Sequence, residues 1–298
     1  TNLKPMYQDE YILGFQKSLN ENFTLGVRGI HRDLKAAIDD NCDYTPIMAA
    51  GGFHYDADEG WINGAGQHAV IPGSGFPYCR IFNPGEDAVY LTDFLDNGTL
   101  TEVTVPGATL SPPAKRKYTA LEFFFEGSWD KFFLQGSYTF AKSIGNTEGG
   151  VKSDIGQQNT NTTQDFDYLE LTVDTYGYLP NDRRHTLKLF GNWEMTDEWS
   201  LGANVLVQSG RPLNCFGVLD RNPGPGLNLH PYGSSFLRCG TTPAGATNDA
   251  TVVARPRGTA GRLVARGRFD GMRDADATVH ASAQRTPSNQ TESLVLVA

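Results

Sequence analysis

The clearest pattern along the chain is an alternation of apolar and polar residues in two neighbouring segments, 184–195 and 199–210. Odd positions of the first segment carry Leu187, Leu189 and Trp193, and the residues between them are mostly polar. A three-residue polar break separates the two segments. A period of two on both sides of a short polar break predicts two antiparallel strands joined as a hairpin.

The same arrangement occurs twice more, in the segment pairs 11–19 with 23–35 and 118–129 with 132–142. Each pair has a short polar turn between its segments, and within each segment most of the Phe, Leu and Trp residues fall on positions of one parity. Because successive side chains of a strand point to opposite faces, we expect three hairpins that each carry one apolar face.

The length of these strands bears on the class of protein. Strands of soluble proteins usually run about five or six residues, whereas strands that cross a bilayer need about 9–11. Trp193 and Trp199 flank one short turn, where an interfacial aromatic girdle would lie. In the segment 118–129, Glu122 and Glu126 fall on the face opposite to most of its Phe and Leu residues, which suits a water-filled lumen. A long amphipathic hairpin in a soluble sandwich is the alternative interpretation.

Three long connections, 41–116, 143–181 and 213–254, separate or follow the hairpins and are rich in Gly, Pro and polar residues. Barrels of the outer membrane alternate short periplasmic turns with long extracellular loops. The sequence therefore predicts an all-β fold, a partial antiparallel transmembrane β-barrel of about six to eight long strands. Residues 89–94 and 101–105 are expected to form a hairpin within the first loop. Six strands cannot close even the smallest barrel of about eight.

The composition narrows the possible partners. The 298 residues are 39% hydrophobic, and no run of about 18 apolar residues predicts a membrane helix. The net charge of −9 argues against a nucleic-acid partner. The chain begins at Thr1 without an apolar signal sequence, so we expect a fragment or a processed form.

Four cysteines lie outside the predicted strands, Cys42, Cys79, Cys215 and Cys239. No Cys-x-x-Cys motif occurs and no His stands at metal-ligand spacing from a Cys, so no zinc site is expected. An even number in polar loops favours disulfides formed in an oxidising compartment. Since each pair falls within one loop, we predict disulfides Cys42–Cys79 and Cys215–Cys239. Four unpaired thiols are the alternative.

Two charged clusters contain residue types that could carry chemistry. His185 follows Asp182, Arg183 and Arg184, which could suggest acid–base catalysis, but a charged cluster at the strand rim with Asp182 paired to an arginine is the preferred interpretation. The acidic group Asp56, Asp58 and Glu59 lacks the full spacing of a calcium loop and is expected to be a solvated loop.

The glycine-rich segment 145–150 precedes no helix and has no P-loop lysine, so it is expected to be a flexible loop. We therefore predict no enzyme activity, no catalytic residues, no cofactor and no metal site.

Four stretches together resemble the C-terminal barrel of TonB-dependent outer-membrane receptors, particularly the Oar-like group. They are LKPMYQDEYILGF (3–15), GSYTFAKS (136–143), LPNDRRHTLKLFGNW (179–193) and SGRPLNCFG (209–217). The Asn-Asp-Arg-Arg-His segment before a strand, combined with Ser-Gly-Arg-Pro at the end of the next, carries most of the likeness. The resemblance covers residues 1–263, which we expect to be part of such a barrel.

The resemblance implies a 22-strand barrel with an N-terminal plug, in the outer membrane of a Gram-negative bacterium. It also implies ligand uptake driven by a TonB complex that grips a short box near the N-terminus. We expect neither plug nor box within these residues, so the chain looks like a piece of a receptor in contact with outer-membrane lipid. The ligand and its binding residues are unknown. A non-transporting surface protein, an adhesin or a structural barrel, is the alternative function.

Residues 264–298 differ from the rest of the chain. They contain one aromatic residue, Phe269, and no nine-residue alternation. A tail with so little to bury is expected to be disordered. We hypothesise that the reading frame shifts near Val264, with a natural linker or an extracellular tail as the alternative.

Overall fold

The computed structural model describes most of the chain up to residue 212 and the backbone of four strands beyond it. The described residues are 2–70, 79–153, 160, 162–172, 175–212, 215–219, 232–237, 275–285 and 292–297. The fold is all-β with a few short helices, as the sequence predicts. No helix among the described residues is long and apolar enough to cross a membrane.

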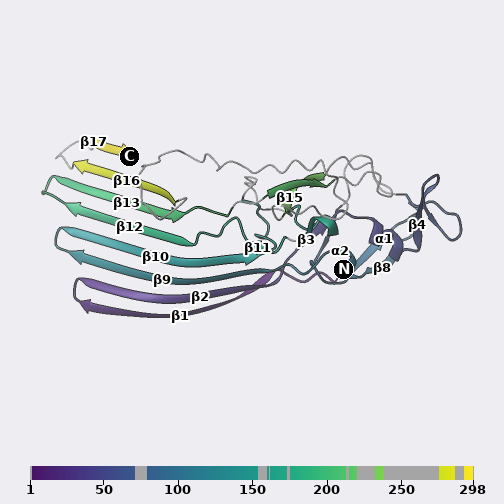
Figure 1. Ribbon diagram of the computed structural model, residues 1–298, viewed down its shortest axis with the longest axis horizontal. Helices are drawn as coiled ribbons and strands as arrows, with labels where there is room; N and C mark the ends of the chain where they lie inside the picture. The colour runs from purple at the N-terminus through teal and green to yellow at the C-terminus, as the bar shows by residue number, and fades with distance from the viewer. Residues whose placement is uncertain are drawn as a thin grey trace.

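One antiparallel sheet of long strands dominates the molecule (Figure 1). Its order is β1-β2-β9-β10-β12-β13-β16-β17, with β11 beside β10, and the sheet is open rather than closed into a barrel. Its strands are β1 (Tyr7–Asn20), β2 (Phe23–Ala36), β9 (Arg116–Trp129), β10 (Phe132–Gly145), β11 (Gly177–Tyr178), β12 (His185–Glu194), β13 (Trp199–Ser209), β16 (Ala275–Arg285) and β17 (Glu292–Val297).

The first three hairpins of this sheet are those that the alternation predicts. The largest difference in their bounds is the start of β1, which lies at Tyr7 instead of residue 11. The three tight turns lie together at one end of the strands, and the long connections lie at the other (Figure 1). The predicted segregation of loops by length is therefore present in the structure.

The register of the sheet joins the apolar faces of the hairpins into one surface. Phe125 of β9 lies opposite Leu25 of β2 on one side and Gly136 of β10 on the other. Gly136 in turn lies opposite Leu189 of β12, and Leu189 opposite Val205 of β13. Because paired residues of neighbouring strands share a face, these five positions follow one row across the sheet. We call the face that carries this row the apolar face.

No protein core covers the apolar face within the part of the chain that the structure describes. Leu13 is 84% exposed, and Phe15, Phe123 and Trp193 are each about half exposed or more. Exposed large apolar side chains on this face lie on all six strands of the three hairpins: Tyr11, Leu13, Phe15, Leu19, Leu25, Leu121, Phe123, Trp129, Phe132, Tyr138, Phe140, Trp193, Trp199 and Leu201. An uncovered apolar area of this extent marks a surface made to contact something other than water.

The long connections fold into a small unit at the other end of the strands (Figure 1). We call the described residues of 39–115 and 146–172 the cap. Its elements are β3 (Asp39–Asn41), α1 (Thr45–Ala50), β4 (Phe53–Asp56), β5 (Gly60–Asn63), β6 (Arg80–Phe82), β7 (Ala88–Thr92), β8 (Thr101–Val105), α2 (Gly107–Leu110) and the 3₁₀ turn η1 (Leu169–Thr172). Beyond it, β14 (Cys215–Leu219) pairs with β15 (Tyr232–Leu237).

The cap contains the principal hydrophobic core of the described residues. Its buried members are Tyr44, Ile47, Met48, Phe53, Trp61, Phe82, Ala88, Tyr90, Phe94, Val103, Val105, Leu110 and Phe166. The predicted hairpin within the first loop is present, since β7 pairs with β8 in antiparallel fashion. The first long loop is thus a folded unit, because apolar side chains that are far apart in sequence converge on one centre.

The tail differs from the expectation of disorder. β16 pairs with β13 over its whole length, and β17 pairs with β16. Without β16, the edge of β13 would present unpaired backbone groups, which accept a neighbouring strand with little regard to its side chains. Residues 264–274 and 286–291 lie outside the described residues. The frameshift hypothesis concerns the nucleotide sequence and stays a prediction.

Candidate functional site

A disulfide links Cys42, directly after β3, to Cys79, directly before β6, with 4.1 Å between the two Cα atoms. The two strands are antiparallel neighbours in which Asn41 pairs with Arg80. The bond closes a chain segment with a sequence separation of 37. Loop closure of that size stabilises a fold by about 3–4 kcal/mol. The disulfide therefore fastens the base of the cap.

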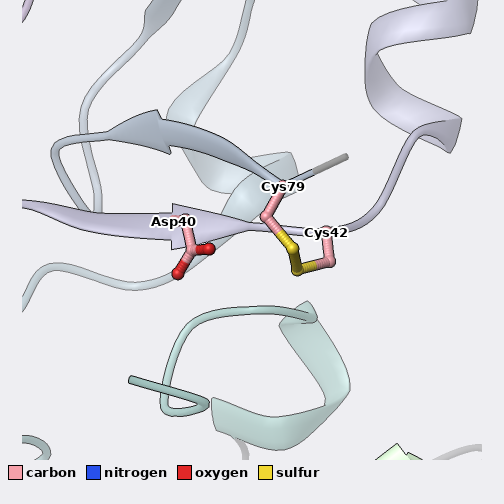
Figure 2. Close-up of side chains that lie close together, drawn as sticks. All are labelled: Asp40, Cys42 and Cys79. Carbon is pink, nitrogen blue, oxygen red and sulfur yellow. A yellow bond between two sulfur atoms is a disulfide. The ribbon is translucent and has the colours of Figure 1, made fainter. Parts of the chain in front are cut away.

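The carboxylate of Asp40 lies beside the two sulfur atoms, and the three ligand-type atoms fall within 4.8 Å of one another (Figure 2). Metal ions bind cysteine as the thiolate. Both sulfurs belong to the disulfide, so only one carboxylate remains as a donor. This cluster consequently does not fit a metal ion.

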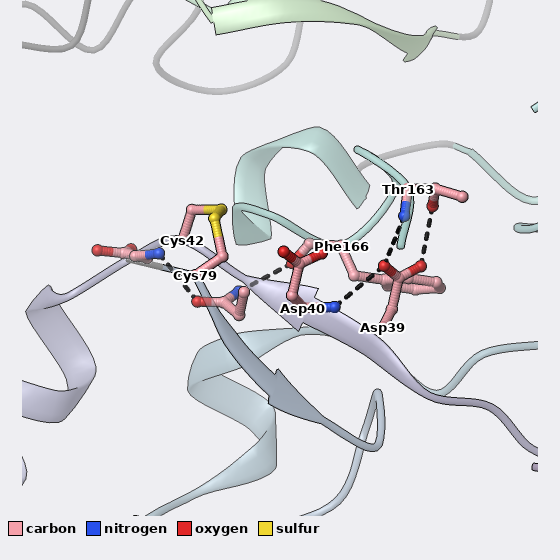
Figure 3. Close-up of a disulfide and its surroundings, with 8 residues drawn as sticks. Asp39, Asp40, Cys42, Cys79, Thr163 and Phe166 are labelled. Carbon is pink, nitrogen blue, oxygen red and sulfur yellow. Dashed lines mark hydrogen bonds between the residues drawn. A yellow bond between two sulfur atoms is a disulfide. The ribbon is translucent and has the colours of Figure 1, made fainter. Parts of the chain in front are cut away.

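Hydrogen bonds dock the second long loop onto β3 (Figure 3). Asp39 accepts two of them, from the backbone N–H and from the hydroxyl of Thr163, each at 2.8 Å. The amide of Asn41 donates to the carbonyl of Phe166 at 2.8 Å, and the N–H of Cys42 donates to the carbonyl of Asp167 at 2.8 Å. The two loops thus meet along one short strand next to the disulfide.

Charged groups are buried in the same place. The ammonium of Lys152 lies 2.8 Å from Asp165, and the two side chains are 1% and 3% exposed. Burial raises the pKa of Asp39 to about 7. Burial, followed by the nearby carboxylates of Asp40 and Asp39, raises the pKa of Asp167 to about 9. These groups are enclosed by protein: the Lys152–Asp165 pair lies within the second long loop, and the Asp39–Thr163 hydrogen bonds join that loop to β3. We call Asp39, Lys152, Thr163, Asp165 and Asp167 the buried polar network.

The Asn-Asp-Arg-Arg-His segment (181–185) connects β10 and β12 at the ends of these strands that lie near the cap. Asp182 accepts the N–H of Ser143 at 2.6 Å and pairs with Arg184 at 3.1 Å. The ring nitrogen Nδ1 of His185 lies 2.7 Å from the hydroxyl of Tyr138. Asp182 thus pairs with an arginine as expected, while His185 hydrogen-bonds a tyrosine of β10. This geometry favours a structural rim cluster over acid–base chemistry.

The predicted loop at Asp56, Asp58 and Glu59 forms the turn between β4 and β5. The carboxylate of Asp56 accepts the backbone N–H groups of Asp58 at 2.8 Å and Glu59 at 3.0 Å. These two hydrogen bonds lower the pKa of Asp56. The acidic cluster is therefore an exposed turn whose first carboxylate is used by its own backbone.

The segment 145–150 is ordered by hydrogen bonds, whereas its sequence predicts a flexible loop. The side chain of Asn146 accepts the N–H of Lys115 at 2.7 Å and donates to the carbonyl of Pro113 at 3.0 Å. The carbonyl of Glu148 accepts a hydrogen bond from Arg116. Glycine content alone signalled flexibility, but an asparagine that satisfies a neighbouring backbone fixes the segment.

The face of the sheet opposite to the apolar face is mostly polar. Arg28 pairs with Glu122 across β2 and β9, and Arg32 lies 2.7 Å from Glu10 across β2 and β1. The guanidinium of Arg28 also lies 5.7 Å from the ring centre of Phe124. Ion pairs of this kind need water or protein around them, which matches the wet side that the sequence predicts.

The second predicted disulfide stays a prediction. Cys215 begins β14, of which only the backbone is described, and Cys239 lies outside the described residues.

No signal in the sequence pointed to the buried polar network, because Asp39, Lys152 and Asp165 lie in stretches of the sequence without periodicity. The nearest sequence signal is the excess of Asp and Thr in the second loop, which is equally typical of solvent-exposed segments.

Comparisons with known proteins agree with the barrel interpretation. No family model matches the chain. The chain is similar to the TonB-dependent transporter Oar of Myxococcus xanthus, with 26% identity over 221 residues, which is 72% of this chain. The matched part makes up 16% of that transporter. This similarity supports a relationship to TonB-dependent receptors at the family level.

Proposed function

We propose that this chain forms part of the wall and the outer loops of a TonB-dependent transporter in the outer membrane of a Gram-negative bacterium. The observation that carries the proposal is the apolar face, which no described residue covers with a protein core and which runs across the six strands of the three hairpins. In this proposal the apolar face contacts lipid, the three tight turns face the periplasm and the cap faces the outside.

The chemistry of the two faces supports a position in lipid. Burying apolar surface is worth about 25 cal/mol per Å², so a row of exposed Phe, Leu and Trp side chains is unfavourable in water. Lipid removes that cost, provided that every backbone hydrogen bond is made within the sheet. The pairs Arg28–Glu122 and Arg32–Glu10 would then lie on the lumen side.

Transport is the function that the related protein suggests, and its name implies a TonB partner. The cap would contact the incoming ligand or restrict access to the lumen. Its rigid core and disulfide suit a loop that presents a fixed surface to the outside.

Energised uptake can be tested while the ligand is still unidentified. Periplasmic solutes would be compared by mass spectrometry in wild-type cells, in cells without this protein and in cells without TonB. Transport predicts that the same solute falls in both mutants. An adhesin or a structural barrel instead predicts loss of surface attachment with no change of any solute, and that result would overturn transport.

A further inference from the structure

Basic and aromatic side chains gather on the apolar face where the strands meet the cap. Lys117 and Thr119 of β9, Lys142 of β10 and Tyr178 of β11 are all exposed there. Lys142 pairs with Thr119, and Ile144 pairs with both Lys117 and Tyr178. The two lysines are therefore diagonal neighbours on one face, about 7–8 Å apart.

Tyr178 forms a platform for two cations. The ammonium of Lys142 lies 5.4 Å and the guanidinium carbon of Arg184 4.8 Å from the centre of its ring. Thr119 also contacts the neighbouring strand β2, because its hydroxyl lies 2.9 Å from Nδ1 of His31. We call Lys117, Lys142, Tyr178 and Arg184 the cationic patch, with Thr119 and His31 at its edge.

Two acidic side chains among the described residues near the cationic patch are already engaged in ion pairs. Asp182 pairs with Arg184, and Asp33, which lies opposite Lys117, pairs with Lys35 at 2.7 Å. Within the part of the chain that the structure describes, neither Lys117 nor Lys142 takes part in an ion pair. The patch thus offers at least two positive charges to an external anion.

The height of the patch matches the boundary of a membrane. Along β10, Phe132 and Lys142 lie ten positions apart (142 − 132) on the same face. At about 3.4 Å per residue and a tilt of about 40°, this distance corresponds to a height of about 26 Å. The apolar band of outer-membrane barrels is about 25 Å tall. If Phe132 lies at the periplasmic boundary, Lys142 reaches the level of the outer headgroups.

We infer that the cationic patch binds the phosphate group of a lipid in the outer leaflet, with Lys117 and Lys142 contacting the phosphate and the ring of Tyr178 holding Lys142 in place beside Arg184. This inference rests on the proposed position in the outer membrane. Charge complementarity and depth both select a lipid headgroup, since a soluble anion would not require the patch to border an apolar band.

The test uses the intact protein in lipid nanodiscs that contain either bis-phosphorylated lipid A or its dephosphorylated form. Native mass spectrometry after release counts the lipid molecules that stay bound. The variant is Lys117→Gln with Lys142→Gln. The matched control is Lys17→Gln with Lys131→Gln, which removes two lysines at the opposite end of the strands.

We expect the wild-type protein to retain the phosphorylated lipid in preference to the dephosphorylated one. Each lysine near a charged lipid surface contributes about fivefold in binding, so the variant, which loses two lysines, should bind about 25-fold more weakly and the control within about twofold of wild type. Circular dichroism and formation of the Cys42–Cys79 disulfide would verify that both variants fold.

The outcomes separate the two proposals. Entry into nanodiscs without preference for phosphate, equal losses in variant and control, or full displacement by excess inorganic phosphate would overturn the lipid site and leave the membrane position standing. Failure of the wild-type protein to enter nanodiscs of either lipid would contradict the membrane position and the lipid site together.

Discussion

The sheet and the cap place their apolar side chains in opposite directions. The six strands of the three hairpins point Phe, Leu and Trp outward and keep ion pairs such as Arg28–Glu122 on the other face. The cap points its apolar residues inward around Phe82 and Val105, and it even buries the charged pair Lys152–Asp165. The cap packs its apolar side chains as a protein in water does, whereas the exposed apolar face of the sheet fits the proposed position in lipid.

The largest effect is expected in the buried polar network. Replacement of Lys152 by Met leaves Asp165 buried without its cation, which typically costs 3–5 kcal/mol, or about 4 kcal/mol here. The cap should therefore unfold locally, as measured by limited proteolysis between residues 79 and 115. A second substitution, Asp165→Leu, should recover much of the loss, and a double variant as unstable as the single one would contradict the assigned pairing.

The disulfide should act on the cap and not on the sheet. Replacing Cys42 and Cys79 together by Ser should lower the stability of the cap by about 3–4 kcal/mol. Hydrogen exchange of backbone amides provides the measurement, with faster exchange expected in β3 and β6 and unchanged exchange in β9 and β10. Equal acceleration in the sheet would show that the two regions unfold as one unit.

A charge on the apolar face should be costly only if that face contacts lipid. Leu189 lies on the apolar face opposite Gly136, near the middle of β10. The substitution Leu189→Arg should therefore cost about 2–4 kcal/mol if this residue faces lipid. The matched control is Gln135→Arg on the polar face, beside Glu126 and Phe190, with an expected change below about 1 kcal/mol. Urea unfolding in vesicles, followed by tryptophan fluorescence, measures both. Similar costs at the two positions would remove the distinction between the faces.

A smaller effect is expected from pH, and it should be confined to the cap. The pKa of Asp39 is raised to about 7 and that of Asp167 to about 9, from 3.8. A raised carboxyl pKa means that the folded cap holds protons that the unfolded chain releases, so stability falls as pH rises from about 4 towards 7 and 9. Proteolysis of the cap should be slower at pH 6 than at pH 8. The difference should shrink in Asp39→Asn, and an opposite trend with pH would refute the assignment.

The contrast between sheet and cap also explains what the sequence could predict. Strands with one apolar face show a period of two in their sequence. The bounds of the three hairpins and the shared face of Phe125 and Leu189 could therefore be predicted from the sequence. The rim pair Asp182–Arg184 was accessible because its members are close in the chain.

The fold of the cap could not be predicted from the sequence in this way. Its core joins Tyr44, Phe82, Val105 and Phe166, which share no period and come from four separate segments. The pairing of Lys152 with Asp165 depends on how the second loop docks on β3, which is a property of tertiary packing. The pairing of β16 with β13 was missed because the edge of β13 imposes strand structure on a segment with no alternation of its own.

The position of the apolar face in lipid can be tested most directly by spin labels at four consecutive residues of β12, Leu187, Lys188, Leu189 and Phe190. Cys215 and Cys239 are replaced by Ser in all four labelled proteins, and the Cys42–Cys79 disulfide is kept. In proteoliposomes, labels at Leu187 and Leu189 should be reached by oxygen, which concentrates in lipid, and labels at Lys188 and Phe190 by a water-soluble nickel complex. Labels at Leu187 and Leu189 that neither reagent reaches would place these residues inside a protein core and contradict a barrel wall.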